Sequence, residues 1–263
     1  MNTSLPPELP REAAQFIGDA TLVRDEIGES PCSVYHFERG GDRFFLKTSP
    51  AFYAATTYSA RREAAALDWL QGRLAVPELV LAAANEHGEC LVTRAVPGRP
   101  LYALIDEGRP VLALFLEALR QVQSVATTAC PLRADVALRL DELAYLIEHE
   151  RVADDADLED WPDLKTPAQV LKRLRATRPE EDLVFSHGDL GDSNVFYDEA
   201  ADRLHFIDLG RAGLADRWLD IAFVHRNLSE ECAPGLAEDF LARLGHPDEP
   251  GKRAYFMLLD QLF

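Results

Sequence analysis

The chain has 263 residues, of which 47% are hydrophobic and 27% are charged, and its formal net charge is −18. This length and composition are typical of a globular protein with one or two domains and a substantial core. The negative charge argues against binding to nucleic acid or to anionic membranes, because both attract clustered Lys and Arg. It favours a polycationic partner, although solubility alone would also explain it.

Cysteines and targeting signals give little indication of an exported protein. The four cysteines, at positions 32, 90, 130 and 232, form no CxxC pair, so we expect reduced thiols and no zinc site. The first residues lack the basic and apolar regions of a signal peptide. The most apolar segment, 111–116, is far shorter than the roughly 20 residues of a membrane span. These features predict a cytoplasmic protein.

The first third of the chain is predicted to contain strands and one helix. The runs "SVYHFER" and "RFFLKT", separated by "GGD", favour a β-hairpin. Residues 56–74 predict a helix capped by Thr56 or Thr57, and residues 78–96 predict two more strands. Pro97 and Gly98 then break the pattern, which places a lobe boundary between residues 1–97 and 98–263.

The rest of the chain is predicted to be mostly helical, with three short strands, "LVFS", "VFYD" and "LHFI". We expect helices over residues 111–126, 134–149, 166–177, 215–227, 234–244 and 252–263. The predicted fold is therefore α+β, with a small sheet-rich lobe before a larger helical lobe.

Two polar motifs lie at the ends of these short strands. "FSHGDLGDSN" contains Asp189 and Asn194, and "FIDLG" contains Asp208. Carboxylate and amide oxygens at Asn194 and Asp208 suit a magnesium ion, and Asp189 is placed to orient a hydroxyl and accept its proton. Protein-kinase catalytic loops have the same spacing between Asp and Asn, with the metal-binding Asp on the next hairpin. The spacing therefore predicts phosphoryl transfer, whereas "HGD" alone would indicate only a capped loop.

A kinase site also needs a cation for the phosphates, and Lys47 can supply it. Because side chains alternate along a strand, Phe45 and Lys47 share a face, suited to adenine and phosphate respectively. Glu63 occurs on the apolar stripe of the predicted helix, where a carboxylate is costly unless it is paired. Lys47 is the expected partner, although a surface glutamate at the edge of the stripe is an alternative.

Other enzyme motifs are absent from the sequence. It contains no GxxxxGK(S/T), no G-x-S-x-G and no H-E-x-x-H, which disfavours a P-loop enzyme, a serine hydrolase and a zinc protease. The kinase Gly-rich loop is also missing, but Ser30 in "GESPCSVY" is available to bind a phosphate.

The chain resembles the aminoglycoside 3′-phosphotransferases, bacterial kinases that inactivate cationic antibiotics. The resemblance extends over nearly the whole length, in family order, through "GESPCSVY", "FFLK", "TTYSARRE", "WLQGRLAVP", "FSHGDLGDSN", "FIDLGRAGLADRW", "DIAF" and "YFMLLDQLF". It implies a two-lobed protein-kinase-like fold, with ATP and two magnesium ions as cofactors and a polycationic aminoglycoside as the acceptor.

The resemblance also implies roles for individual residues. Asp189 corresponds to the catalytic carboxylate, and Asn194 and Asp208 to the metal ligands. The residues implied to bind the nucleotide are Lys47, Glu63, Phe45, Ser30, Arg94 and Val96, the last two through hinge backbone groups. Those implied to bind the aminoglycoside are Asp260, Phe263 through its carboxylate, Arg211, Glu230, Glu231, Glu159 and Asp160.

Individual acids in this second set could equally belong to a solvated face. Gln261 stands where many family members have Glu, which removes one pocket charge, and residues 151–166 differ in composition and length from relatives. Two alternatives to an aminoglycoside kinase remain at this point. One is a kinase of another amino alcohol or sugar on the same fold, and the other is a catalytically silent nucleotide-binding module.

Overall fold

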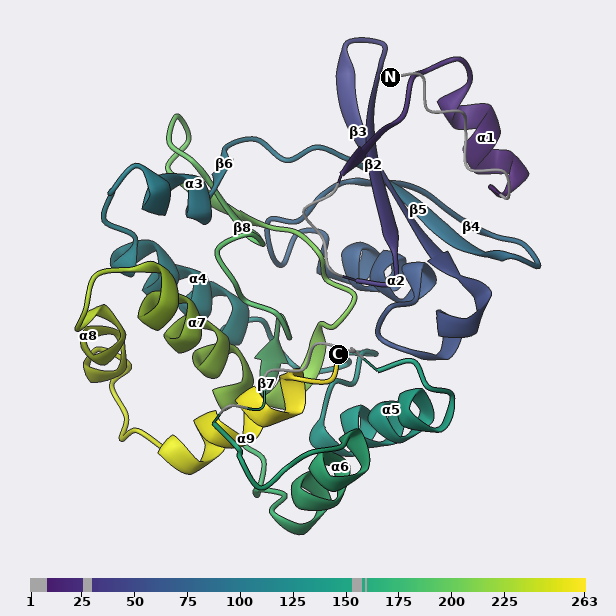
Figure 1. Cartoon of the computed structure of the whole chain (residues 1–263). Coiled ribbons are helices and arrows are strands. Elements are labelled where there is room, and N and C mark those ends of the chain that lie inside the picture. Colours follow the sequence, from purple (N-terminus) through teal and green to yellow (C-terminus); the bar gives the residue numbers. More distant parts are fainter. Residues whose placement is uncertain (1–8, 26–29, 153–157, 159) are drawn as a thin grey trace. The chain divides into compact units, whose positions relative to one another are not determined.

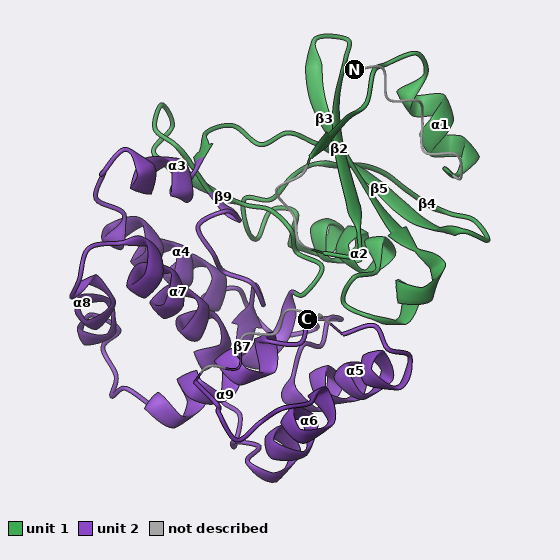
Figure 2. Ribbon diagram, in the orientation of Figure 1, with its two compact units in different colours: residues 1–99, 196–211 green, residues 100–195, 212–263 purple. Residues whose placement is uncertain are grey.

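The computed structural model describes residues 9–25, 30–152, 158 and 160–263. The chain divides into two compact units, which Figure 2 shows in different colours. The first unit contains residues 1–99 and 196–211, and the second contains residues 100–195 and 212–263. The first stretch thus ends two residues after the predicted boundary at Pro97, and the segment 196–211, which we expected in the second lobe, groups with the first unit.

The first unit is built on a five-stranded antiparallel sheet in the order β1-β2-β3-β5-β4 (Figure 1). Its strands are β1 (Val23–Asp25), β2 (Ser33–Arg39), β3 (Asp42–Pro50), β4 (Leu79–Ala84) and β5 (Gly88–Arg94). The predicted hairpin is present, because Arg39 pairs with Asp42 across a two-residue Gly40-Gly41 turn. The short strands β8 (Val195–Asp198) and β9 (Arg203–Phe206) follow β6 (Arg99–Pro100) in a second sheet, of order β6-β8-β9.

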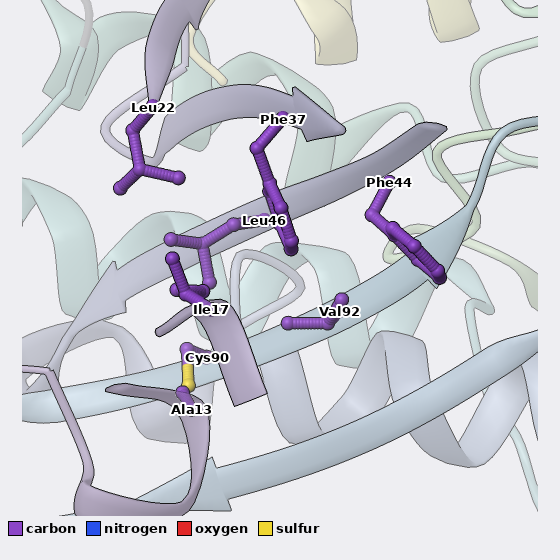
Figure 3. Packing of buried hydrophobic residues seen from close by; sticks show 8 residues of the cluster. All are labelled: Ala13, Ile17, Leu22, Phe37, Phe44, Leu46, Cys90 and Val92. Atoms are coloured by element: carbon purple, nitrogen blue, oxygen red, sulfur yellow. The ribbon is translucent and has the colours of Figure 1, made fainter. Parts of the chain in front are cut away.

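Alternation along β3 gives the two sheet faces different environments. Phe44 and Leu46 point to one face, where they join α1 (Arg11–Ile17) in the apolar cluster of Figure 3. Phe45 and Lys47 therefore point to the other face, as the sequence predicted. On that face lies α2 (Ala60–Leu70), whose Glu63 reaches Lys47.

The start of α2 differs from the prediction. Its N-cap is Ser59, whose side chain accepts a hydrogen bond from the Arg62 N–H, so the predicted caps Thr56 and Thr57 were wrong. Thr56 instead stabilises the turn after a 3₁₀ helix, η1 (Ala51–Ala55): its hydroxyl donates to the Tyr53 carbonyl at 2.8 Å and accepts from the Tyr58 N–H at 3.1 Å.

The second unit is mostly helical, as predicted (Figure 1). Its helices are α3 (Leu101–Asp106), α4 (Leu112–Gln123), α5 (Val136–Glu148), α6 (Pro167–Ala176), α7 (Trp218–Glu231), α8 (Leu236–Ala242) and α9 (Pro250–Asp260). Strands β7 (Leu183–Ser186) and β10 (Gly213–Asp216) form an antiparallel pair. The sequence analysis missed α1, η1, α3, β1, β6 and β10, all of which are short.

The buried Asp216 fixes the junction between β10 and α7. Its fully buried carboxylate accepts the Trp218 N–H at 2.8 Å, the Asp182 N–H at 2.9 Å and the Lys252 ammonium at 2.7 Å. A buried carboxylate is tolerated only when it is paired in this way. The position of α7 matters because this helix contacts the polar loop that follows β7.

None of the four cysteines, all of which the structure describes, forms a disulfide bond. Among the residues that the structure describes, no helix is both long and apolar enough to cross a membrane.

Candidate active site

The first unit contains a lysine held between two carboxylates. The Lys47 Nζ lies 2.8 Å from the Glu63 Oε2 and 2.6 Å from the Asp208 Oδ1, so the predicted pair of Lys47 and Glu63 is present. Burial alone would lower the pKa of Lys47, but the two carboxylates outweigh it and raise this pKa above its ordinary value. Lys47 is therefore a fixed ammonium group at any physiological pH.

Glu63 reaches a buried position because it follows the apolar stripe of α2. Ala60, Leu67 and Leu70 on the same stripe are fully buried, and Glu63 is only 6% exposed. Burial raises the pKa of Glu63, and the adjacent Lys47 ammonium opposes that shift. The second carboxylate oxygen of Glu63 accepts the Leu209 N–H at 3.3 Å, so this side chain fixes both the lysine and the loop that carries Asp208.

The loop around Asp208 is held in an unusual backbone conformation. Asp208 has φ +55°, in the left-handed region that non-glycine residues rarely adopt. The Arg62 Nε donates to the Gly210 carbonyl at 2.8 Å, and a Cβ at position 210 would lie 2.8 Å from the Thr57 carbonyl oxygen. Residue 210 must therefore be glycine for the loop to lie this close to the turn before α2, and α2 in turn holds the loop of the strained Asp208 through Arg62 and Glu63.

The second unit contains Asp189 and Asn194, which the structure brings together. The Asn194 Nδ2 donates to the Asp189 Oδ2 at 3.1 Å and to the Asp189 carbonyl at 2.9 Å. Because both contacts need the NH₂ end of the amide, its Oδ1 faces away from Asp189. Asn194 therefore offers a carbonyl oxygen to a cation while it orients the catalytic candidate.

Asp220 supports this loop, and the sequence analysis did not identify it. It is completely buried on α7, and its two carboxylate oxygens accept the N–H groups of His187 and Gly188, each at 2.9 Å. Burial raises the pKa of Asp220, and the nearby His187 and these hydrogen bonds oppose the shift. The available signal was an aspartate among the apolar residues of "DIAF", where an unpaired carboxylate would be too costly.

The remaining residues predicted to bind nucleotide do not all lie on the sheet face that carries Lys47. Phe45 is half-buried on the Lys47 face, and Ser30 is exposed, with its hydroxyl accepting the Cys32 N–H at 3.3 Å. Arg94 pairs across the sheet with Phe44 and forms ion pairs with Asp42 and Glu78, so its side chain lies on the face opposite Lys47. Its N–H donates to the Glu78 carbonyl at 3.0 Å. Val96 is half-buried just after β5.

A pocket of about 410 Å³ lies in the second unit, lined mainly by α7 and α9. Two of the predicted acids, Asp160 and Glu230, line it, and so does Gln261. Two arginines also line it, and each is paired with a carboxylate: Arg226 with Asp260 at 3.1 Å and Arg253 with Asp248 at 2.7 Å. Asp160 and Glu230 are both exposed, so their charge is available to an amine.

The other predicted acceptor residues are not among the pocket-lining residues. Asp260 is bonded to Arg226, and Glu231 is exposed on α7. The Phe263 ring lies 3.9 Å from the buried Arg139 guanidinium. Arg211 groups with the first unit and contacts the Tyr58 hydroxyl at 3.4 Å. Glu159 lies outside the described residues.

Comparison with known proteins identifies the family. Residues 26–256 match the model of the phosphotransferase enzyme family. An aminoglycoside 3′-phosphotransferase of Acinetobacter baumannii is 43% identical, over 97% of this chain and 99% of the relative. One from Enterococcus faecalis is 34% identical, over 96% and 97% of the two chains. The crystal structure of an aminoglycoside 3′-phosphotransferase of type VIII superimposes with a TM-score of 0.82 at 30% identity, over 96% and 97% of the two chains.

The chain therefore belongs to the phosphotransferase enzyme family and, within it, to the aminoglycoside 3′-phosphotransferases. The predicted family, enzyme class and two-lobed kinase-like fold are confirmed. An aminoglycoside phosphotransferase of Streptomyces rimosus, solved with ADP and streptomycin, shares this fold at 22% identity with a TM-score of 0.76.

Proposed function

We propose that the chain transfers the γ-phosphoryl group of ATP to the 3′-hydroxyl of an aminoglycoside antibiotic in the cytoplasm and so confers resistance. One observation carries the chemical part: Asp189 and Asn194, in the loop between β7 and β8, are hydrogen-bonded to each other and have the spacing of the protein-kinase catalytic loop. The acceptor class is supported by full-length similarity to aminoglycoside 3′-phosphotransferases.

Residues 1–97 act as the nucleotide-binding lobe in this proposal. Lys47, held by Glu63, binds the phosphates as a fixed positive charge. Phe45 stacks on adenine, and Ser30 contacts a phosphate through its hydroxyl or N–H. Arg94 and Val96 contribute backbone groups to the base. For Arg94 this leaves the carbonyl, because its N–H already donates to Glu78.

Asp208 and Asn194 would hold magnesium, and their chemistry fits that ion. Magnesium sites in kinases use one or two protein oxygens together with substrate phosphates, so a dedicated cluster of acids is unnecessary. Asn194 offers its carbonyl oxygen because its NH₂ is bonded to Asp189. Asp208 is 47% exposed and carries a second carboxylate oxygen besides the one on Lys47. Magnesium, as two ions, would neutralise the charge of the phosphate oxygens during transfer.

Residues 98–263 act as the catalytic and acceptor-binding lobe. Asp189 accepts a hydrogen bond from the attacking hydroxyl and takes its proton as the new O–P bond forms, while the bond from the γ-phosphorus to the bridging oxygen breaks and ADP leaves. The Asn194 amide, bonded to the same carboxylate, fixes the direction in which the remaining oxygen of Asp189 points.

The acceptor pocket binds ammonium groups through Asp160 and Glu230, which line it. Glu159, Glu231, Asp260, the Phe263 carboxylate and Arg211 complete the proposed acceptor set. Asp260 would have to share its carboxylate with Arg226 when an amine binds there. Gln261 contributes a neutral amide to the pocket, so it can bind a hydroxyl or amine only through a hydrogen bond.

The test is ADP release by the purified protein with Mg·ATP, comparing kanamycin with tobramycin, which lacks the 3′-hydroxyl. Turnover with kanamycin alone would support transfer to the 3′ position. Equal turnover with both drugs would move the site of transfer elsewhere on the drug. No turnover with any aminoglycoside would overturn the proposed acceptor class and favour another amine or sugar, or a silent nucleotide-binding protein.

A further inference from the structure

The middle of the loop that joins Asp189 to Asn194 is anchored by a side chain outside the loop. The Asp192 N–H donates to the Asn227 Oδ1 at 2.7 Å, and the Asp192 carbonyl accepts the Tyr102 N–H at 3.3 Å. Because the partner of Asn227 is an N–H, the oxygen of its amide must face the loop. Both backbone groups of Asp192 are thus fixed by helices of the same unit.

Asn227 lies two turns after Asp220 on α7, so the two side chains emerge from the same helix face. Asp220 binds the N–H groups of His187 and Gly188, which precede Asp189. Asn227 binds the N–H of Asp192, which follows it. The helix therefore holds the loop on both sides of the proposed catalytic carboxylate.

The contact between Asn227 and the loop is close. A Cβ added at Gly191 would lie 3.3 Å from the Asn227 Oδ1, which is tighter than ordinary van der Waals contact. The absence of a side chain at residue 191 allows the loop backbone to approach α7 and form the 2.7 Å hydrogen bond.

A short series of hydrogen bonds connects this anchor to the reacting groups. The Gly191 N–H donates to the Asp189 carbonyl at 2.9 Å, and the Asn194 N–H donates to the Gly191 carbonyl at 3.2 Å. The Asn194 side chain then bonds to the Asp189 carboxylate at 3.1 Å. Displacement of residues 191–192 would therefore move Asp189 and Asn194 together.

We propose that Asn227 is a positioning residue for phosphoryl transfer, acting through the backbone of residues 191 and 192 to fix Asp189 and Asn194. This inference rests on the proposed function, because that function gives Asp189 and Asn194 their roles in phosphoryl transfer. In this proposal Asn227 acts through the loop backbone and not by contact with the substrate. Its loss should therefore lower kcat more than it changes the KM for the drug.

The informative variants differ only in whether they keep the acceptor. Asn227→Leu has a similar size but leaves the Asp192 N–H without its partner, and we expect kcat to fall about tenfold or more, since small misplacements of reacting groups are costly. Asn227→Asp keeps an oxygen at the same place, and we expect it to stay within about threefold of the wild type, because a charged acceptor bonds an N–H at least as well. Asn227→Ala provides a smaller deletion if the leucine does not fold.

The matched control is Gln121→Leu, which removes a side-chain amide from the surface of α4 in the same unit. The Gln121 side chain donates to Glu117 at 2.8 Å on the same helix, and neither residue belongs to the proposed site. We expect Gln121→Leu to match the wild type in kcat and in both KM values.

The experiment combines steady-state kinetics with hydrogen exchange of the peptide that spans residues 187–194. We expect faster exchange and a lower kcat in Asn227→Leu, with both restored in Asn227→Asp and each variant fully folded at the assay temperature. Unchanged exchange, or faster exchange with an unchanged kcat, would overturn the proposal. Failure of the wild type to phosphorylate any aminoglycoside would instead refute the proposed function, while the exchange data would still decide whether Asn227 anchors the loop.

Discussion

Replacement of Glu63 by Gln tests the charge arrangement around Lys47. In the structure the ammonium lies 2.8 Å from Glu63 and 2.6 Å from Asp208, and the side chains of Lys47 and Glu63 are only 14% and 7% exposed. Glutamine has nearly the same shape but only one oxygen, which would turn toward the Lys47 ammonium, so the Leu209 N–H would lose its acceptor. Of these two carboxylates, only Asp208 would then balance the ammonium.

The expected size of the effect follows from what the substitution preserves. Removing one partner from a buried ion pair costs about 3–5 kcal/mol, but glutamine still offers a neutral oxygen to Lys47. The relevant loss is the difference between a charge-assisted and a neutral hydrogen bond, about 1–1.5 kcal/mol. At about 1.4 kcal/mol per factor of ten, this predicts a KM for Mg·ATP that is about five- to tenfold higher.

A second effect should accompany the first. Without Glu63, the ammonium is drawn more strongly to Asp208, which is the proposed magnesium ligand. The magnesium concentration that gives half-maximal rate should therefore rise as well, while the KM for the aminoglycoside stays the same.

The assay is ADP release as a function of ATP at two magnesium concentrations and saturating drug. The control is Glu117→Gln, which removes a carboxylate bonded to Arg120 on the surface of α4. If Glu63→Gln behaves like this control, or if only the KM for the drug changes, Glu63 does not position the phosphate-binding lysine and the reasoning is wrong.

Three other predictions concern the second unit. Asp189→Ala should lower the transfer rate by about 10²–10⁴ while calorimetric ATP affinity is retained, and near-wild-type turnover would remove its assignment as the base. Asp216→Ala deletes the buried partner of Lys252 and should cost about 3–5 kcal/mol in urea denaturation, so a loss below about 1 kcal/mol would contradict the structural role. Burial, together with Arg253, lowers the pKa of His225 below its ordinary 6.5. The unfolded chain then binds this proton at higher pH than the folded one, so stability falls as the pH drops through about 6.5. His225→Gln should reduce the difference in melting temperature between pH 7.5 and pH 5.5, and an unchanged difference would refute this assignment.

The sequence predicted the lysine and glutamate pair because two independent patterns had to agree. Alternation on β3 placed Lys47 on the face of Phe45, and helical periodicity placed Glu63 on the apolar stripe of α2. Each placement alone has a trivial explanation. Together they leave a buried carboxylate that needs a cation, and the structure supplies that cation at 2.8 Å.

The sequence did not predict the N-cap of α2 correctly, because several neighbouring residues can all act as helix caps. Thr56, Thr57 and Ser59 are all residues that favour helix N-caps, and sequence alone does not select among them. The structure selects Ser59, whose side chain accepts the Arg62 N–H at 3.1 Å and donates to the Glu89 carboxylate at 2.6 Å. The deciding partner, Glu89, lies thirty residues away on β5, so no local window contains it.

The loop supports were missed for a related reason. Asp220 and Asn227 were included in a predicted helix, but their partners are backbone N–H groups of a loop more than thirty residues earlier. Nearly every residue type has a backbone N–H group, so the sequence of the loop does not show which of its residues bond to Asp220 and Asn227. The only clue was the cost of an aspartate on a buried helix, which indicates that a partner exists without saying where it is.

The period of α7 explains how one helix can serve both the loop and the pocket. Residues 220 and 227 are seven positions apart, nearly two full turns, and both face the loop. Residues 222, 225, 226 and 229, which line the pocket, lie on the opposite side of a helix with 3.6 residues per turn. Glu230 also lines the pocket, but it lies only about 60° around the helix from Asn227. Substitutions on the pocket side can therefore change drug contacts without touching the anchors of Asp189. Selectivity for the acceptor and alignment of the catalytic loop are separable along this helix, because they depend on different faces of the same rigid element.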